Sequence, residues 1–406
     1  MASDDSFASV IRVNIALLRL SGVVSYENGS IRRSSSQNIL GAIAYGCLFA
    51  YAGLYTYEFA LRTVYLETWM ESFAMILSLV GGQARFTIVL LFRSRFQRLL
   101  IICEELWAAL NATEKKHVCD YVKTTRHLTY YYLFGCAFTI FFYAVASLFM
   151  GQHDDSSNAT MRTLPYACPV EVHRSPYYEI MYIVQLCSMI NVGLTCAGAD
   201  TVGPVLVLTV CGHFKVLNTR ILHLSDRDRV YSEKSCSTAT HESHKITREN
   251  DIPKNRAKFN LKACVCYHQT MLELCKEVEN LTNSIFLTQL VGSTYNVSLV
   301  GFKLAGDDPD KFKYTTQLLI AIIQLFLCNW AANVLLTESQ DVARAIYFTP
   351  WYRFPYQLKK SLHIITMRSQ KPAQLTAGSI IPLSLQTFAS MVSSAASFFT
   401  MISNVN

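Results

Sequence analysis

The last apolar segment of the chain carries a regular series of polar side chains. At about 100° per residue along a helix, six of them fall within roughly 120° of one another; they are Ser390, Ser393, Ser394, Ser397, Thr400 and Asn404. Lipid offers no hydrogen-bond partner to such a strip, so it faces protein or water. Close packing against a neighbouring helix and a water-lined path for ions both fit this pattern, and packing is the commoner arrangement.

Two apolar residues, Met401 and Val405, lie in or beside this strip near its far end. Side chains four residues apart stand one turn apart on the same helix face. Such a pair can form a hydrophobic constriction, which closes a pore by dewetting. The spacing is compatible with the gate of an ion pathway, but alone it does not require one.

The rest of the sequence shows no pattern that indicates catalysis. We find no nucleophile with a partnering base, no metal-ligand spacing and no phosphate-binding loop, so we expect neither an enzyme nor a cofactor. Most of the 13 cysteines lie within apolar blocks, without a repeated Cys-x-x-Cys pair. The net charge of +7 is spread over several connecting segments, which argues against a nucleic-acid partner.

The composition around these residues is that of a membrane protein. Of the 406 residues, 51% are hydrophobic and 16% are charged, below the roughly 25% charge of soluble domains. The apolar residues form blocks of about twenty, long enough to cross a hydrocarbon core of about 30 Å as helices. We predict an all-α membrane protein with seven transmembrane helices near 38–59, 70–92, 128–150, 178–199, 281–302, 314–337 and 382–403.

The distribution of Lys and Arg predicts the orientation. The segments on one side of the seven spans hold 29 of these residues and the segments on the other side hold 6. The positive-inside rule then places the N-terminus in the cytoplasm and the C-terminus outside. A G-protein-coupled receptor, an alternative receptor class, has the opposite orientation. Asn158 is the one Asn-x-Ser/Thr site in a loop that we place outside, so it is the candidate glycosylation site.

The connecting segments divide the chain further. Residues 226–262 are mixed in charge and rich in Ser and Thr, which predicts a flexible loop, whereas 263–280 and 338–368 have helical spacing and extend the spans into a water-facing bundle. The expected regions are a cytoplasmic N-terminal segment (1–37), the first four spans with the ligand-binding part (38–199), a cytoplasmic extension with the loop (200–280), two spans (281–337), anchor helices (338–372) and the pore-lining span (382–406).

Three charged residues lie within or beside the spans. We place Arg85 low in the 70–92 helix, within reach of the cytoplasmic interface, and Asp200 and Glu338 at cytoplasmic helix ends. We interpret all three as members of structural pairs in the anchor and not as ion-binding or proton-relay sites.

The C-terminal third contains residues that resemble the insect odorant receptor family. The resemblance spans the whole chain but is specific mainly in the last 70 or so residues. It rests on Glu338, Ala345-Ile346-Tyr347, Trp351, Arg368-Ser369-Gln370-Lys371-Pro372, Leu375, Ala377-Gly378, Pro382-Leu383-Ser384-Leu385-Gln386, Phe388 and Ser397-Phe398-Phe399-Thr400. One departure is Ala331, near which the family pattern has a glycine.

This resemblance implies an odorant-gated, non-selective cation channel in the plasma membrane of sensory neurons. It implies a heterotetramer with the family's co-receptor, in which the last helix lines the pore and Met401 and Val405 hold the gate positions. The 226–262 loop is short and unlike that of the co-receptor, so the chain resembles a ligand-tuning subunit. A gustatory-type homomeric channel is an alternative, although the usual gustatory signature is absent from 382–406.

The family's ligand pocket lies in the outer half of the membrane, among the second, third, fourth and sixth spans. We project this depth onto the present sequence. It implies a small, mostly apolar volatile, bound mainly by burial, with polar selectivity from Tyr143, Tyr182 and Gln185. The implied contacts are Phe73, Ile76, Leu77, Thr139, Phe142, Tyr143, Tyr182, Gln185, Tyr314, Leu318 and Ile322.

Overall fold

The computed structural model describes residues 7–20, 66–149, 175–224, 251–305 and 311–403, with short pieces within 22–60 and 152–164. Helices dominate this part of the chain, which confirms the predicted all-α fold. They are α1 (Phe7–Val10), α2 (Arg12–Leu20), α4 (Leu66–Leu91), α5 (Arg93–Ala108), α6 (Ala112–Phe149), α7 (Tyr177–Leu222), α9 (Asp251–Ala305), α10 (Lys311–Phe348), α11 (Tyr356–Ser369) and α12 (Leu385–Ser403), with the 3-10 turn η1 (Trp351–Arg353).

Short antiparallel strand pairs occur in the connections. They are β1 (Tyr26–Glu27) with β2 (Ser30–Ile31), β3 (Gln152–His153) with β4 (Thr160–Met161), and β5 (Thr376–Ala377) with β6 (Ile381–Pro382).

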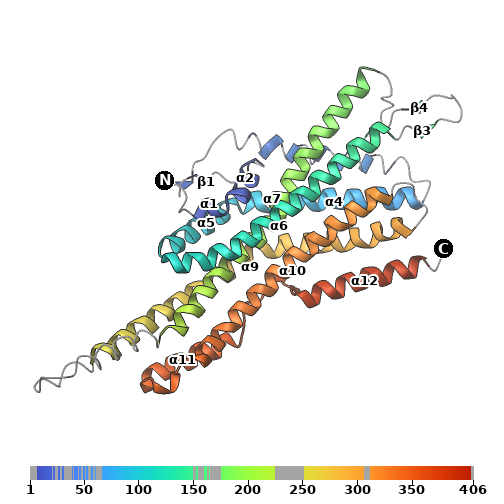
Figure 1. Ribbon diagram of the computed structural model, residues 1–406. Helices are drawn as coiled ribbons and strands as arrows, with labels where there is room; N and C mark the ends of the chain where they lie inside the picture. Colours follow the sequence, from blue (N-terminus) through green and yellow to red (C-terminus); the bar gives the residue numbers. More distant parts are fainter. Residues whose placement is uncertain are drawn as a thin grey trace, which may run out of the picture.

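Three helices that run together are much longer than a membrane is thick, as is the 38-residue helix α6. Helices α7, α9 and α10 have 46, 55 and 38 residues, or about 69, 83 and 57 Å at about 1.5 Å per residue, against a core of about 30 Å. They run together toward one end of the molecule, where α11 packs on α10 (Figure 1). The helical extensions that the sequence predicts over 263–280 and 338–368 are therefore present. The last part of the loop predicted over 226–262 is instead helical, because α9 begins at Asp251, and residues 226–250 lie outside the described part of the chain.

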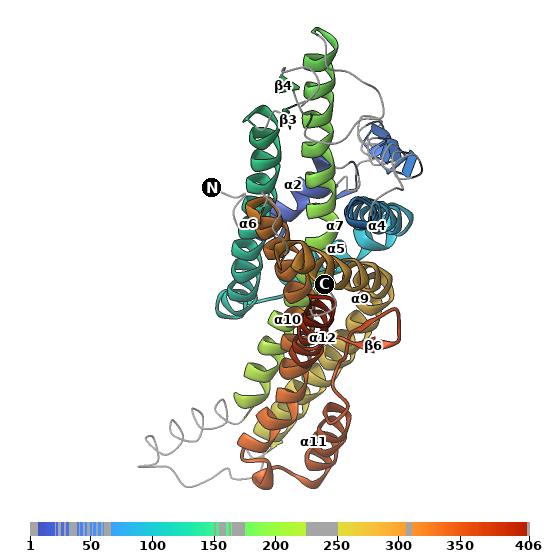
Figure 2. The same ribbon diagram turned by 90° about the vertical axis from the view of Figure 1, so that its right-hand side faces the viewer.

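Three segments of the described helices are long and apolar enough to cross a membrane, namely 112–145, 177–222 and 314–348, and a shorter apolar helix covers 79–91. The predicted span at 281–302 is also helical, as part of α9, and the span at 382–403 is helical from Leu385 on, as α12. Much of the first predicted span, 38–59, lies outside the described residues. Within the bundle, α6 lies on one side of α7 and α4 lies on the other (Figure 2).

The second half of α7 forms the centre of the hydrophobic core. Its residues from Thr201 to Phe214 are all buried, and α2, α6, α9 and α10 pack around it. A helix that is apolar on every side is expected to be enclosed in this way. Our placement of Asp200 at a helix end is therefore wrong: Asp200 lies inside α7, 1% exposed, because the apolar run that follows it continues the helix to Leu222.

The connection into α12 is fixed to the bundle by backbone contacts. Gly378 has φ +62°, and a Cβ there would lie 2.6 Å from the side chain of Leu287, so only glycine suits both the conformation and the space. Its N–H donates to the carbonyl of Asn283 at 3.0 Å. The N–H of Ser384 donates to the side-chain oxygen of Asn329 at 3.2 Å. This amide on α10 satisfies one of the donors that the start of a helix leaves open.

Candidate functional site

A cavity of about 240 Å³ lies between five helices of the bundle. It is smaller than the roughly 300–1,000 Å³ of pockets that hold drug-sized ligands. Apolar side chains and glycines form most of the wall, with several amides and hydroxyls among them. The lining comes from α4 (Leu77, Leu79, Gly81, Arg85), α6 (Tyr132, Cys136, Thr139, Ile140, Tyr143), α7 (Met189, Val192, Gly193, Cys196), α9 (Gly292, Ser293, Asn296) and α10 (Gln317, Ile320, Ala321, Gln324).

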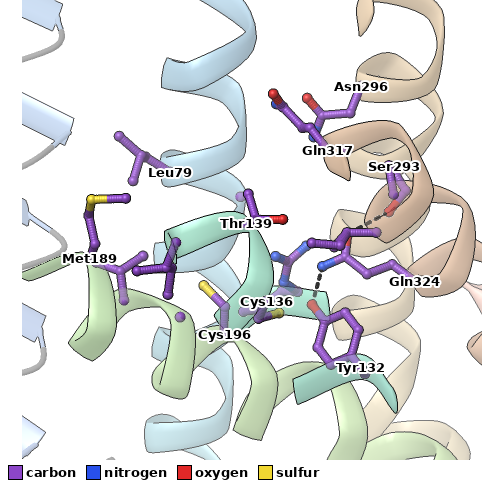
Figure 3. A pocket seen from close by; sticks show the side chains of 18 of the residues that line it. Leu79, Tyr132, Cys136, Thr139, Met189, Cys196, Ser293, Asn296, Gln317 and Gln324 are labelled. Carbon is purple, nitrogen blue, oxygen red and sulfur yellow. Dashed lines mark hydrogen bonds between the residues drawn. The ribbon is translucent and has the colours of Figure 1, made fainter. Parts of the chain in front are cut away.

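One end of the cavity is closed by a network of polar side chains, which we call the polar floor: Arg85, Tyr132, Asp200, Ser293 and Gln324. The Arg85 Nε lies 2.9 Å from an Asp200 carboxylate oxygen. The other Asp200 oxygen accepts from the Tyr132 hydroxyl and from the Gln324 amide, both at 2.8 Å. The Gln324 amide also donates to the Tyr132 hydroxyl and accepts from Ser293 at 3.3 Å (Figure 3).

The polar floor is buried in an apolar surrounding. Arg85 is 6% exposed and Asp200 is 1% exposed, and a charge in such a place is stable only when it is paired and hydrogen-bonded. The expectation that both residues belong to structural pairs is met by their ion pair. Its position differs from the expected one, because Arg85 turns inward to Asp200 at the cavity and does not extend to a membrane surface.

The wall above the floor combines apolar side chains with amides. Leu79 and Met189 lie across the cavity from Ser293 and Gln324, whereas Asn296 and Gln317 lie near each other, away from Tyr132 (Figure 3). Toward this end, the hydroxyl of Tyr143 donates to the side-chain oxygen of Gln317 at 3.2 Å. Most of the cavity therefore suits an apolar ligand body, and its polar groups stand at two separate positions, the floor and the Asn296–Gln317 end.

Three of the contacts implied by the sequence line this cavity: Leu77, Thr139 and Tyr143. Two others are engaged nearby. The Tyr182 hydroxyl donates to the backbone oxygen of Ala144 at 3.0 Å, and Phe142 packs edge-on against Phe138 and Phe141. The remaining described side chains do not belong to the lining, namely Ile76, Gln185, Tyr314, Leu318 and Ile322. The side chain of Phe73 is not among those that the structure describes.

Sequence reasoning missed the whole contribution of α9. The family-derived depth argument uses four spans, whereas Gly292, Ser293 and Asn296 add a fifth helix to the wall. A signal for the floor was present, since Arg85 is an ionisable residue within a predicted span, and such residues usually mark a functional position. No comparable signal distinguishes Gly292.

The polar strip of α12 lies on the surface of the chain. Ser390, Ser393, Ser394, Ser397 and Thr400 are all exposed, and Met401 is 61% exposed. The hydroxyls of Ser394, Ser397 and Thr400 also donate to carbonyls of their own helix at 2.8–2.9 Å. The opposite face of α12 packs on the bundle through Phe388, Met391 and Val392. Asn404, Val405 and Asn158 lie outside the described residues.

Comparisons with known proteins agree on one family. A family model described as "7tm Odorant receptor" matches residues 65–396. Odorant receptor 63a of Drosophila melanogaster is 24% identical over 70% of this chain, and Odorant receptor 83a of the same species is 20% identical over 60%. The chain spans 66% and 61% of the length of these two relatives.

Solved structures share the fold. The insect olfactory receptor OR5 from Machilis hrabei has a TM-score of 0.74 to this chain at 16% identity, with 97% of each chain covered. The same receptor in complex with eugenol has a TM-score of 0.73 at 15% identity, with 98% of each chain covered. At such identities the likeness is one of fold. Because the family model covers most of the chain, this protein is a member of the insect odorant receptor family.

Proposed function

We propose that the chain is the ligand-tuning subunit of an odorant-gated, non-selective cation channel, and that a small volatile binds in the five-helix cavity. The observation that carries this proposal is the cavity itself, a mostly apolar space of about 240 Å³ with a few polar groups at defined positions. Sites for small molecules have this character. The relative OR5, which shares the fold, was solved with eugenol.

The size of the cavity limits the affinity that burial can supply. An aromatic body buries about 150–250 Å², which at about 25 cal/mol per Å² stabilises the complex by about 4–6 kcal/mol. This corresponds to dissociation constants from about 1 mM to tens of micromolar. Apolar burial therefore accounts for weak binding of many volatiles, and the few polar contacts decide among them.

The exposed strip of α12 supports a pore at the centre of an assembly. Ser393, Ser394 and Ser397 face away from the chain's own bundle, so a neighbouring subunit or water must meet them. The Ser394 and Ser397 hydroxyls donate to backbone carbonyls, which leaves their oxygens free to contact water or cations. In this proposal Met401 and Val405 form the gate, with Thr400 and Asn404 beside them.

A second surface supports assembly with other subunits. Aromatic side chains at the end of α10, in η1 and at the start of α11 are exposed, with Tyr347 and Phe348 at 74% and Tyr356 at 81%. Contiguous exposed aromatic surface marks protein interfaces. We place the odorant co-receptor there, in a heterotetramer in the plasma membrane of sensory neurons, with the N-terminus, the 200–280 region and the 338–372 anchor in the cytoplasm.

Voltage clamp tests this proposal directly. The chain is expressed with and without an insect odorant co-receptor, and a broad panel of volatiles is applied. We expect reversible, odorant-evoked cation current in cells that express both. Current from this chain alone would instead indicate a homomeric channel, and silence in both despite surface expression would refute the channel proposal. An antibody to an N-terminal tag tests the orientation, because intact cells should exclude it.

A further inference from the structure

Within the polar floor, the guanidinium of Arg85 has more hydrogen-bond donors than its neighbours accept. A guanidinium has five N–H donors, and within the described residues Asp200 is the acid that pairs with Arg85, through Nε. Arg85 also lines the cavity. The terminal nitrogens of a buried cation need an acceptor, since an unsatisfied charged donor is costly in an apolar site.

The neighbours of Arg85 are already committed to each other. The Tyr132 hydroxyl donates to Asp200 and accepts from Gln324. The Gln324 amide nitrogen donates to both of these residues, and its oxygen accepts from Ser293. The hydroxyl of Thr139, higher in the wall, donates to a carbonyl of its own helix at 3.1 Å. Among the described residues the guanidinium has one further contact, with the thiol of Cys196, and sulfur is a weak acceptor. The network therefore orients the floor and leaves guanidinium donors to serve a ligand.

We propose that Arg85 is the specificity-determining residue of the cavity, donating a hydrogen bond to the oxygen of a neutral carbonyl compound. The ligand class is ketones, aldehydes and esters with an apolar body. This inference rests on the proposed function, since it names the ligand class of the same cavity. Its physical basis is that Arg85 can only donate hydrogen bonds and that Asp200 already neutralises its charge. A neutral acceptor therefore suits the guanidinium better than an anion.

The floor disfavours amines, carboxylates and hydrocarbons. An amine is protonated at neutral pH, and Arg85 has donors but no acceptor for it. A carboxylate at Arg85 would lie close to Asp200, which is buried behind the lining, and like charges repel strongly in a poorly screened site. A hydrocarbon binds by burial alone and leaves the guanidinium donors unsatisfied. A neutral carbonyl oxygen satisfies them without adding charge.

Matched ligand pairs test this inference on the wild-type channel. In each pair the C=O of a carbonyl compound is replaced by C=CH2, which keeps the shape and removes the acceptor, as in 2-heptanone against 2-methyl-1-heptene and acetophenone against α-methylstyrene. A hydrogen bond to a charged group predicts that the carbonyl member is about ten- to a hundred-fold more potent. Equal potency within the pairs, or responses confined to hydrocarbons, amines or acids, would overturn the inference.

A double variant assigns the preference to Arg85. Arg85→Met together with Asp200→Asn removes both charges, so neither is left buried and unpaired. We expect the potency ratio within each pair to fall to near one, through a weaker carbonyl response, while the hydrocarbon response persists. Thr139→Val is the matched control for the ratio: it alters another lining hydroxyl and changes the potency of both members of a pair alike, so the ratio between them should stay the same. A ratio unchanged in the double variant would overturn the role of Arg85.

A second variant covers the case in which the double variant does not reach the cell surface, as measured by surface biotinylation. Arg85→Lys keeps a charge opposite Asp200 but has fewer donors in a different geometry, so the ratio should fall without being lost. An unchanged ratio would again overturn the inference. Silence of the wild-type channel to the entire volatile panel is a different result, since it refutes the proposed function and this inference with it.

Discussion

Replacing Gly292 with valine would add three carbon atoms to the wall of the cavity. Gly292 lines the cavity, and a Cβ placed there has no atom within 4 Å, so the new side chain projects into space that a ligand would occupy. Valine has at least the helix propensity of glycine, and α9 should fold as before. The variant therefore changes the volume available to a ligand with little other effect.

The magnitude follows from the ligand atoms displaced. Each buried methylene stabilises a complex by about 0.8 kcal/mol, so excluding three carbons costs about 2.4 kcal/mol, or about a 50-fold loss of potency. The loss should grow with ligand length, because a short homologue does not reach Gly292. Dose–response curves for a homologous series of one agonist measure this, on cells that also express the co-receptor.

The control lies on the same turn of α9. Val291 is 51% exposed, and Val291→Leu adds a carbon outside the cavity, so it should leave every potency unchanged. Surface biotinylation checks that both variants reach the membrane in equal amounts. If Gly292→Val left the whole series unshifted, or shifted short and long homologues equally, the cavity could not be the binding site.

Three further predictions concern other parts of the chain. Met401→Lys should reduce cation current without reducing surface assembly, because a positive charge in the pore repels cations; unchanged current would remove Met401 from the pore. Asn329→Ala removes the acceptor for the Ser384 N–H and should destabilise the purified protein by about 1–3 kcal/mol; an unshifted melting temperature would contradict this. Burial, and to a lesser extent Arg368, lowers the pKa of His268 to about 4. Between pH 6.5 and 4 the unfolded chain then binds the extra proton, so stability should be complete above 6.5 and fall as the pH falls, and His268→Asn should flatten this dependence in pH-dependent thermal unfolding.

Much of the fold follows from hydrophobic pattern alone. Segments such as 128–150 and 314–337 are apolar enough to predict helices, and the helical spacing of 263–280 predicts the extension of α9. Asp200 shows where the pattern fails. A charge after an apolar block is normally a helix end at the membrane surface. Asp200 can lie inside α7 because Arg85, Tyr132 and Gln324 on other helices pair with it.

The candidate site depends more on tertiary packing than the helices do. Leu77, Thr139 and Tyr143 were located by depth, because residues at one level of a bundle share a neighbourhood. Gly292 could not be found in this way, since its importance comes from the missing side chain and from which face of α9 meets the cavity. Hydrophobic periodicity is weak on a helix that is packed on several sides, so the sequence does not indicate that face.

The most direct test of the central claim is a structure of the assembled channel with an agonist bound, determined by electron cryomicroscopy. Our account predicts agonist density between α4, α6, α7, α9 and α10, with its polar end at Arg85 and the α12 helices around the central pore. Agonist density at another site, with this cavity empty, would contradict the account.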